Sequence, residues 1–307
     1  MLEAKWFPEA RLNFAQNLLK FRDDRQAIVA YDERGKQKTL TYSQLFQKVA
    51  SLSLWLKVQG IKPGDKVVGF MPNVPETIIT MLAATSLGAI WSSCPTDLTA
   101  QEVVDRFAQI EAKIFVCCDG YFYEGKKQDN VKKLNEIIPN LASIEHVLVV
   151  PCVDANHCSA QINERLKGVT HLKELHLFDD CLTEEINNIE FASLPFDHPL
   201  YILYRPSTTG AAEYIVHGAG GTLLQHYKEL VMHANVKATD TIFYDCNCGE
   251  VMWSNMASTL MTGATLVLFD GSPFFPGPEV LWNIAERESV SIFATNSQYI
   301  TDSQIPK

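Results

Sequence analysis

The segment 201–217 carries the residues whose types and spacing most favour chemistry. A strand-like apolar run leads into Ser207, Thr208, Thr209 and Gly210. Hydroxyl and backbone N–H groups that converge in such a loop bind phosphate, because several donors then face one anion. The spacing is not that of a Walker loop, which needs a glycine, four residues and then Gly-Lys. From these four residues alone, a phosphate site and a plain turn between two strands are equally favoured.

Other patterns that suggest binding sites are better explained by packing. The run 218–221 is similar to a dinucleotide-binding fingerprint, but Leu223 stands where the third glycine belongs, which favours a close-packed turn. Candidate metal ligands are Cys246 with Cys248, Cys152 with His157 and Cys158, and His226 with His233. The cysteine groups lack a second pair at zinc-site spacing, and the two histidines share one face of a predicted helix. Packing is therefore favoured, and no metal ligand and no catalytic residue is predicted.

Alternating helices and strands must position the loop. Thr41 is typical of a helix N-cap, and Leu45, Val49, Leu52 and Leu56 then recur along one helix face. Similar patterns predict strands at 67–71, 89–91, 113–118, 146–150, 200–204, 241–244, 264–269 and 290–294. They predict helices at 75–87, 100–110, 130–138, 221–236, 251–261 and 278–288. This alternation predicts an α/β fold of doubly wound, mostly parallel sheets covered by helices.

The chain becomes more polar and irregular between residues 154 and 195. We therefore expect a first α/β subdomain at 1–153 and a connecting excursion at 154–195. A second α/β subdomain at 196–307 would hold the loop and be incomplete at its C-terminus. Residues 299–307 are expected to form a frayed end, because they have no cap of their own.

Charge and composition argue against several classes of protein. The 307 residues carry 36 acidic and 26 basic side chains, and a formal charge of −10 repels nucleic acid and anionic membranes. The longest apolar stretch, 78–91, is too short and too polar to span a bilayer, and residues 1–8 lack a signal-peptide pattern. The 8 cysteines lack the density of a disulfide scaffold, which favours a reduced, cytoplasmic protein.

Short motifs spread along the whole chain carry a family resemblance. They are Trp6-Phe7-Pro8, Arg11-Leu12-Asn13, Asn17-Leu18-Leu19, residues 88–93, Asp105-Arg106-Phe107, residues 194–200, Val216-His217-Gly218 with Gly220-Gly221, and residues 270–273. In this order they resemble the N-terminal part of the acetoacetyl-CoA synthetase family, which belongs to the acyl-adenylate-forming (AMP-binding) ligases. The resemblance implies that the fold is part of the N-terminal domain of such a ligase.

The same resemblance implies a two-step ligation in ketone-body and lipid metabolism. ATP and acetoacetate would form an acyl-adenylate and pyrophosphate, and the thiol of CoA would then displace AMP. In the family, Mg²⁺ screens the phosphates, and hydroxyls, amides and cations stabilise the transferring group. The implied partners are these small molecules, with no nucleic acid and no membrane.

The phosphate loop departs from the family pattern, which reads Tyr-Ser-Ser-Gly-Thr-Thr-Gly-x-Pro-Lys. Within 204–213, only the tyrosine, the two threonines and the second glycine match. Pro206 removes an N–H donor, and Ser207 replaces a glycine, so a positive φ there is costly. Glu213 replaces the lysine; a charge pair at about 4 Å is worth roughly 1 kcal/mol in water and about 4 near a protein surface. The reversal therefore weakens polyphosphate binding, although Arg205 could return one positive charge.

A second motif, near the acyl pocket and the thiol tunnel of the family, reads Gly-Trp-Met-Met-Trp-Asn. Here it reads Gly249-Glu250-Val251-Met252-Trp253-Ser254. The resemblance implies that Gly249, Val251, Met252 and Trp253 form part of an acyl and CoA pocket. Glu250 replaces a large aromatic residue, and a carboxylate beside a pocket for an anionic acid is unfavourable unless it is paired or protonated.

The family's relatives continue beyond Lys307, with the ribose-binding Asp, a hinge and a catalytic Lys. The chain is therefore expected to be truncated and inactive by itself. Two alternatives remain: a non-catalytic pseudoenzyme or remnant with a binding role, and one half of a split ligase. An incomplete sheet would leave an open edge, which predicts self-association.

Overall fold

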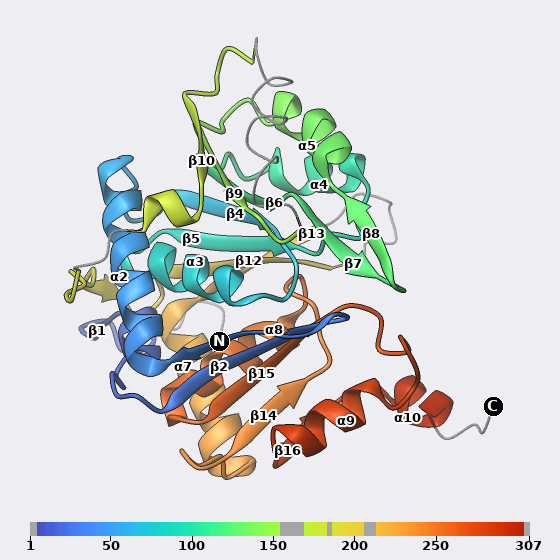
Figure 1. The fold of residues 1–307 in the computed structure, drawn as a ribbon. Helices are drawn as coiled ribbons and strands as arrows, with labels where there is room; N and C mark the ends of the chain where they lie inside the picture. The colour runs from blue at the N-terminus through green and yellow to red at the C-terminus, as the bar shows by residue number, and fades with distance from the viewer. Residues whose placement is uncertain (1–4, 154–168, 183–185, 206–212, 304–307) are drawn as a thin grey trace.

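Two stacked sheets dominate the computed structural model, which describes residues 5–153, 169–182, 186–205 and 213–303 (Figure 1). The larger sheet contains, in spatial order, β10 (Glu174–Leu177), β9 (His146–Val150), β6 (Ile114–Cys118), β4 (Lys66–Phe70), β5 (Ile90–Cys94), β12 (Pro199–Arg205) and β13 (Glu213–Gly218). The smaller contains β16 (Ile292–Ala294), β14 (Thr241–Tyr244), β15 (Thr265–Asp270), β2 (Gln26–Asp32) and β3 (Gly35–Thr41). Only β13 and β3, each at an edge, pair antiparallel with their neighbours in these sheets.

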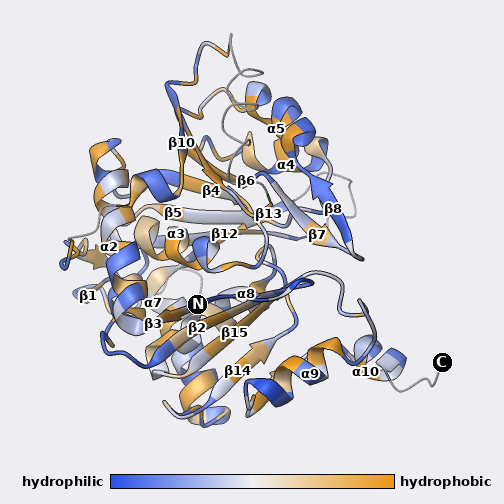
Figure 2. Ribbon diagram, in the orientation of Figure 1, coloured by the Kyte–Doolittle hydropathy of each residue, from blue (hydrophilic) through white to orange (hydrophobic). Residues whose placement is uncertain are grey.

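Two small antiparallel pairs accompany the sheets. The strand β1 (Arg11–Leu12) pairs with β11 (Leu194–Pro195), and β7 (Gly120–Tyr123) forms a hairpin with β8 (Lys126–Asp129). The hairpin lies at the carboxyl end of β6, and its second strand is hydrophilic (Figure 2).

Helices cover both faces of both sheets. The α-helices are α1 (Phe14–Leu18), α2 (Tyr42–Val58), α3 (Pro75–Ser86), α4 (Ala100–Phe107), α5 (Val131–Ile137), α7 (Ala219–Tyr227), α8 (Val251–Ala257), α9 (Val280–Arg287) and α10 (Ser297–Ser303). Shorter helical turns are η1 (Ile138–Asn140), η2 (Asp179–Cys181), η3 (Lys228–His233) and η4 (Ser258–Thr262). None of the described helices combines the length and apolar character needed to cross a bilayer.

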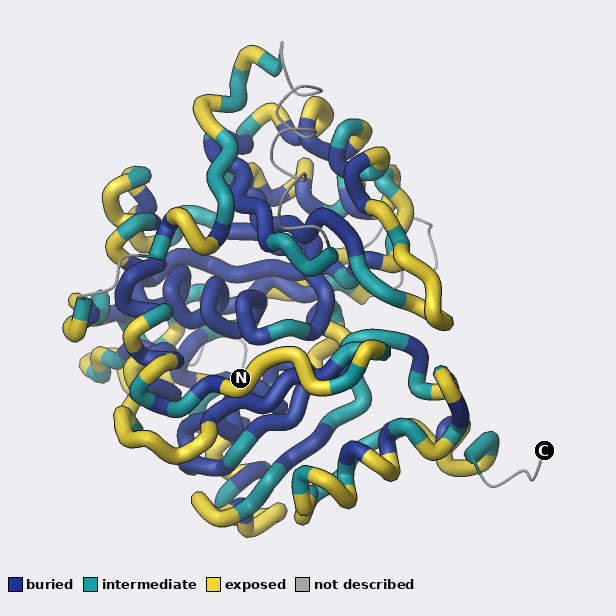
Figure 3. The backbone as a smooth tube through the Cα atoms, viewed as in Figure 1, coloured by how far each residue is buried: buried dark blue, intermediate teal, exposed yellow. Residues whose placement is uncertain are grey.

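The buried side chains form three clusters that define five layers. The central cluster joins the facing sides of both sheets through α1, α2, α3, α7 and α8. A second packs the outer face of the larger sheet against α4 and α5, and a third packs the smaller sheet against α9 and α10. All residues of α3 are buried, as its dark blue colour in Figure 3 shows. The predicted α/β class with helix-covered, mostly parallel sheets is confirmed.

Local signals explain where helices begin and end. Thr41 caps α2 and forms a reciprocal capping box with Gln44. Gly60 and Gly88 follow α2 and α3 with φ of 83° and 79°, a backbone conformation that glycine adopts without the strain a side chain would cause. The predicted helix at 221–236 is shorter than expected, because α7 ends at Tyr227 and continues as the π-helical turn η3.

The expectation of a frayed end at 299–307 is wrong for its first half. Residues Ser297–Ser303 form α10, where the Asn296 side chain accepts a hydrogen bond of 2.8 Å from the backbone N–H of Tyr299. The Tyr299 ring is buried against α9 and the smaller sheet. Residues 304–307 lie outside the described residues.

Each of the two sheets combines strands that are far apart in the sequence. The early strand β2 pairs with β15, while the later strands β12 and β13 complete the larger sheet. The subdomain boundaries at 153 and 195 stay a prediction, and each of the two outer segments contributes strands to both sheets.

The order of the larger sheet reverses between β4 and β6. The chain adds β5 on one side of β4, and β6, β9 and β10 then follow on the other. In doubly wound sheets, ligands bind outside the carboxyl ends of the strands at such a reversal. The residues that follow β4 and β6 are therefore candidates for a ligand-binding site.

Candidate functional site

The predicted phosphate residues Ser207, Thr208, Thr209 and Gly210 lie outside the described residues, which resume at Glu213. The strands on either side, β12 and β13, pair antiparallel along their length, from Pro199 with Gly218 to Arg205 with Glu213. The loop therefore connects two neighbouring strands.

An ion pair joins the two strands at the base of this loop. Glu213 accepts hydrogen bonds from Arg205 Nη2 at 2.5 Å and Nε at 2.9 Å. Both side chains are more than half exposed, at 64% and 51%, so the pair adds at most about 1 kcal/mol of stability. The pair also neutralises Arg205, the cation considered as a substitute for the family's lysine, through the residue that replaced that lysine.

A hydrogen-bonded hub links the two sheets at the carboxyl ends of β4 and β15. Asn73 follows β4, and its backbone N–H donates to Asp270 at 3.1 Å. Its side-chain oxygen accepts from Trp253 Nε1 at 2.9 Å, and its amide nitrogen donates to the carbonyls of Cys246 and Phe269. Because Asn73 is buried and each of its polar side-chain atoms is paired, it fixes α8 relative to the larger sheet.

The predicted acyl and CoA residues do not share one environment. Trp253 is buried in the hub, and Gly249 lies where a Cβ would come within 2.8 Å of the Pro95 ring. Val251 and Met252 are exposed, at 55% and 47%. The structure thus brings the first pair into the contact between the sheets and leaves the second pair on the surface. Their role in an acyl or CoA pocket stays a prediction.

Glu250, which replaces the family's aromatic residue, is exposed and has an amide partner. The side-chain nitrogen of Asn247 donates to it at 2.6 Å, and the backbone N–H of Asn247 donates at 3.2 Å. The carboxylate is therefore held by neutral donors, and no cation forms an ion pair with it among the described residues.

Cys248 and His226 both lie buried among neighbouring residues near this region. The Cys248 thiol donates to the Met71 carbonyl at 3.0 Å, and burial raises the pKa of the thiol well above its usual value. His226 is buried beside Ser258, with 2.7 Å between Nδ1 and Oγ, and burial lowers its pKa to about 4. The packing interpretation of these two side chains is thus consistent with their surroundings; His157 and Cys158 lie outside the described residues.

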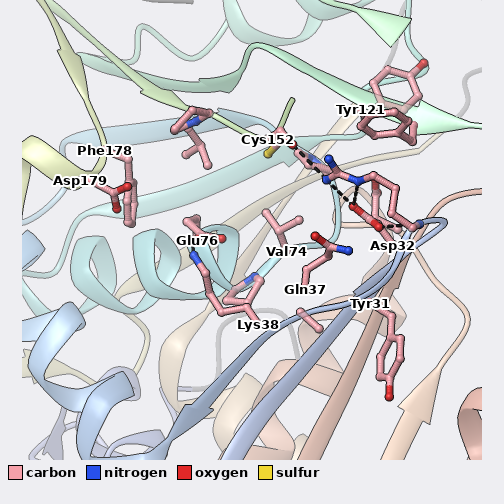
Figure 4. Close-up of a pocket in the computed structure, with 18 residues that line it drawn as sticks. Tyr31, Asp32, Gln37, Lys38, Val74, Glu76, Tyr121, Cys152, Phe178 and Asp179 are labelled. Atoms are coloured by element: carbon pink, nitrogen blue, oxygen red, sulfur yellow. Dashed lines mark hydrogen bonds and ion pairs between the residues drawn. The ribbon is translucent and has the colours of Figure 1, made fainter. Parts of the chain in front are cut away.

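A cavity of about 210 Å³ lies between the sheets beside the reversal in strand order between β4 and β6 (Figure 4). Pro72 and Val74 from the end of β4, Tyr121 from β7 and Cys152 after β9 line one side. The β2–β3 hairpin lines the other side, and Asp270 of the hub also faces the cavity. Spacing and motifs did not predict this site, because its walls come from segments far apart in the sequence.

Two acid–base pairs lie in the cavity wall. Arg34 Nη2 lies 2.6 Å from Asp32 Oδ2 and donates to the Cys152 carbonyl at 3.3 Å. Lys38 pairs with Glu76 at the start of α3. Figure 4 shows Lys38 of the hairpin extending toward Glu76 of α3, with Asp32 at the end of β2. Both cations of the wall are therefore already neutralised.

Glu33, at the tip of the β2–β3 hairpin, ties the walls together. Its carboxylate accepts backbone hydrogen bonds from Glu124 at 2.8 Å, Gly125 at 2.7 Å and Ser272 at 2.8 Å. The Arg34 guanidinium also lies 4.2 Å from the centre of the Phe122 ring. These contacts hold the β7–β8 hairpin against the smaller sheet and so fix the shape of the cavity.

The carboxylate of Asp270 is buried beside the cavity, where its negative charge is unfavourable. Burial raises its pKa to about 6, and the nearby carboxylates Asp32, Glu33 and Asp97 act in the same direction. The N–H of Asn73 opposes the shift without cancelling it. A carboxylate with a raised pKa beside a cavity marks a candidate functional group.

The described residues give a poor fit to the triphosphate of Mg-ATP. Arg205 and Glu213 cancel each other's charge at the base of the loop, so they provide no net positive charge. The wall of the cavity also carries more acidic than basic side chains. Polyphosphate binding relies on cations and on converging N–H donors.

Comparisons with known proteins place these observations in a family. A sequence model described as AMP-binding enzyme matches residues 14–300. The chain is 44% identical over 300 residues to acetoacetyl-coenzyme A synthetase of Rhizobium meliloti, covering 98% of this chain and 45% of that protein. It is 37% identical over 303 residues to acetoacetyl-CoA synthetase of Rattus norvegicus, covering 97% and 44%.

The fold agrees with a solved structure. Acetoacetyl-CoA synthetase from Streptomyces lividans matches with a TM-score of 0.88 and 34% identity, covering 97% of this chain and 44% of that one. The chain spans less than half the length of these relatives. The resemblance that the short motifs carry is confirmed along nearly the whole sequence. This chain belongs to the AMP-binding enzyme family.

Proposed function

We propose that this chain is an acetoacetyl-CoA synthetase-like protein of the acid–thiol ligase class. Its substrates would be acetoacetate, ATP with Mg²⁺, and CoA. The observation that carries the proposal is the family match over residues 14–300, together with 44% identity to a named acetoacetyl-coenzyme A synthetase. A reduced, cytoplasmic setting is part of the proposal, supported by the low density of cysteines, 8 in 307 residues, which is unlike a disulfide scaffold.

Within this function, the loop residues Ser207, Thr208, Thr209 and Gly210 would hold the phosphates, and Mg²⁺ would screen their charge. The residues Gly249, Val251, Met252 and Trp253 would form part of the acyl and CoA pocket. The Asn73 contact with Trp253 supports this assignment, because it would orient the start of α8 toward the carboxyl end of β4.

We further propose that the isolated chain binds nucleotide weakly and has no measurable turnover. Pro206 and Ser207 alter the loop itself, and Glu213 pairs with the cation Arg205. The ion pair also favours a second candidate function, a non-catalytic member that binds a partner. One half of a split ligase is a weaker alternative, because a working half would be expected to keep its phosphate loop.

The test restores the family loop in this chain. The variant combines Arg205→Ser, Pro206→Ser, Ser207→Gly and Glu213→Lys, and calorimetry measures the affinity for Mg-ATP. We expect at least about tenfold tighter binding than in the natural chain, since one tenfold step corresponds to about 1.4 kcal/mol. The control is Glu136→Gln, which changes the net charge by the same +1 as the four loop substitutions together, on the exposed outer side of α5. No gain over this control would show that the loop is not the defect.

A second measurement tests catalysis directly. Acetoacetate-dependent exchange between ATP and pyrophosphate requires formation of the acyl-adenylate. We expect no exchange with the natural chain alone. Exchange above background would overturn the proposed inactivity, and exchange that appears only with a second polypeptide would identify a split ligase.

A further inference from the structure

The cavity at the reversal between β4 and β6 has the features of a small-ligand site, and neither Arg205 nor Glu213, the described residues that flank the phosphate loop, lines it. It is enclosed by both sheets, by the β7–β8 hairpin and by η2. Its volume of about 210 Å³ is below the roughly 300–1,000 Å³ of pockets for drug-sized molecules, so its ligand must be small. The Glu33 contacts described above keep the walls in place without a ligand.

The charges of the wall decide the sign of that ligand. Four carboxylates line the cavity, and they are Asp32, Glu76, Asp179 and Asp270. The two bases that line it, Arg34 and Lys38, are paired with the first two of these acids. Asp179 and Asp270 have no basic partner among the ion pairs of the described residues. The surplus is negative, which disfavours phosphates and carboxylates and favours a cation.

The apolar part of the wall indicates an organic cation. Tyr121, Phe122 and Phe178 line the cavity, with Pro72 and Val74 beside them. Aromatic faces attract ammonium groups, and the proline and valine side chains suit a hydrocarbon body. A metal ion would use the carboxylates and leave these apolar surfaces without a partner.

We propose that this cavity binds a small primary amine with an apolar body, whose ammonium group donates to Asp270. The ligand would lie between the two sheets and contact the same carboxylate that receives the Asn73 N–H. Binding of the amine to Asp270 would therefore alter the hydrogen bonds of the hub that positions α8.

The test uses three probes of nearly equal shape and different charge. They are 2-phenylethylamine, 2-phenylethanol and phenylacetate, titrated into the full chain at pH 7.5 and followed by calorimetry and ligand-observed NMR. We expect the amine to bind about tenfold more tightly than the alcohol, the size of one charge-assisted hydrogen bond. The acid should not bind. Equal affinity for amine and alcohol, tighter binding of the acid, or binding of none of the three would overturn the proposal.

Two variants locate the site. Asp270→Asn should reduce the affinity for the amine to that of the alcohol. The control is Asp180→Asn, at an exposed residue that follows Asp179 in the sequence but does not line the cavity, and it should leave the affinity for the amine unchanged. Val74→Phe should fill the cavity and abolish binding of both probes. Unchanged amine affinity in both Asp270→Asn and Val74→Phe, with circular dichroism confirming their folds, would place the binding elsewhere.

Discussion

Replacement of Asp270 by asparagine should make the protein more stable at neutral pH. Burial raises the pKa of this carboxyl from 3.8 to about 6, so the folded state holds its proton more tightly than the unfolded chain. This shift corresponds to about 3 kcal/mol at 1.36 kcal/mol per pKa unit. Stability from this group is complete below pH 3.8 and is lost as the pH rises to 6.

The variant removes that loss and keeps an acceptor for the Asn73 N–H. A neutral amide accepts more weakly than a carboxylate, which takes back about 1 kcal/mol. We therefore expect Asp270→Asn to be more stable than the natural chain by about 2 kcal/mol at pH 7.5 and to be nearly equal at pH 4.5. Urea unfolding, followed by tryptophan fluorescence and circular dichroism at both pH values, measures the difference.

The comparison between variant and natural chain at each pH cancels the titration of other groups, His226 included. A variant that is no more stable at pH 7.5, or whose gain is the same at pH 4.5, would refute the reasoning about buried charge. The same substitution is expected to weaken amine binding. Opposite effects on stability and binding would be typical of a residue retained for function.

Three further predictions follow from described contacts. Burial lowers the pKa of His226 to about 4, so the natural chain should lose up to about 3 kcal/mol as the pH falls from 6.5 to 4, and His226→Gln should flatten this acid limb in urea unfolding. Trp253→Phe removes the donor to Asn73 and should lower stability by about 1–3 kcal/mol in thermal or urea unfolding. The half-buried edge strand β16 should mediate self-association, which light scattering would detect as a mass above one chain, and Ile292→Lys should reduce it.

Each of these has a clear contrary result. An acid limb that is unchanged in His226→Gln would show that another group titrates. A Trp253→Phe variant as stable as the natural chain would mean that the Asn73 contact adds nothing. A single-chain mass at micromolar concentration would contradict association through β16.

Much of the fold could be predicted because its signals are local. The stripe from Leu45 to Leu56 and the glycines Gly60 and Gly88 define α2 and the end of α3 from neighbours within a few turns. Strands β9 and β14 occur at the predicted residues for the same reason, since each is a short apolar run between breaks.

Features that depend on distant partners could not be predicted. The hairpin of β2 and β3 has mixed polarity, and β2 is buried only because β15 lies beside it. The site shows the same division. The loop around Thr208 and the motif around Trp253 were found by resemblance, whereas the contact of Asn73 with Asp270 joins residues that are 197 positions apart. No periodic pattern in a single sequence encodes such a contact.

The pairing of β2 with β15 has a consequence for synthesis. Ile28 pairs with Leu266, so the first of these strands leaves the ribosome well before its neighbour exists. At roughly 5–20 residues per second, that wait lasts about 12 to 50 seconds. During this time one edge of the nascent strand has no hydrogen-bonding partner. Neither sheet can be completed until strands from both halves of the chain have been synthesised. The smaller sheet is therefore expected to form only after β15 has left the ribosome, and holdase chaperones that bind extended segments would cover the edge of β2 until then.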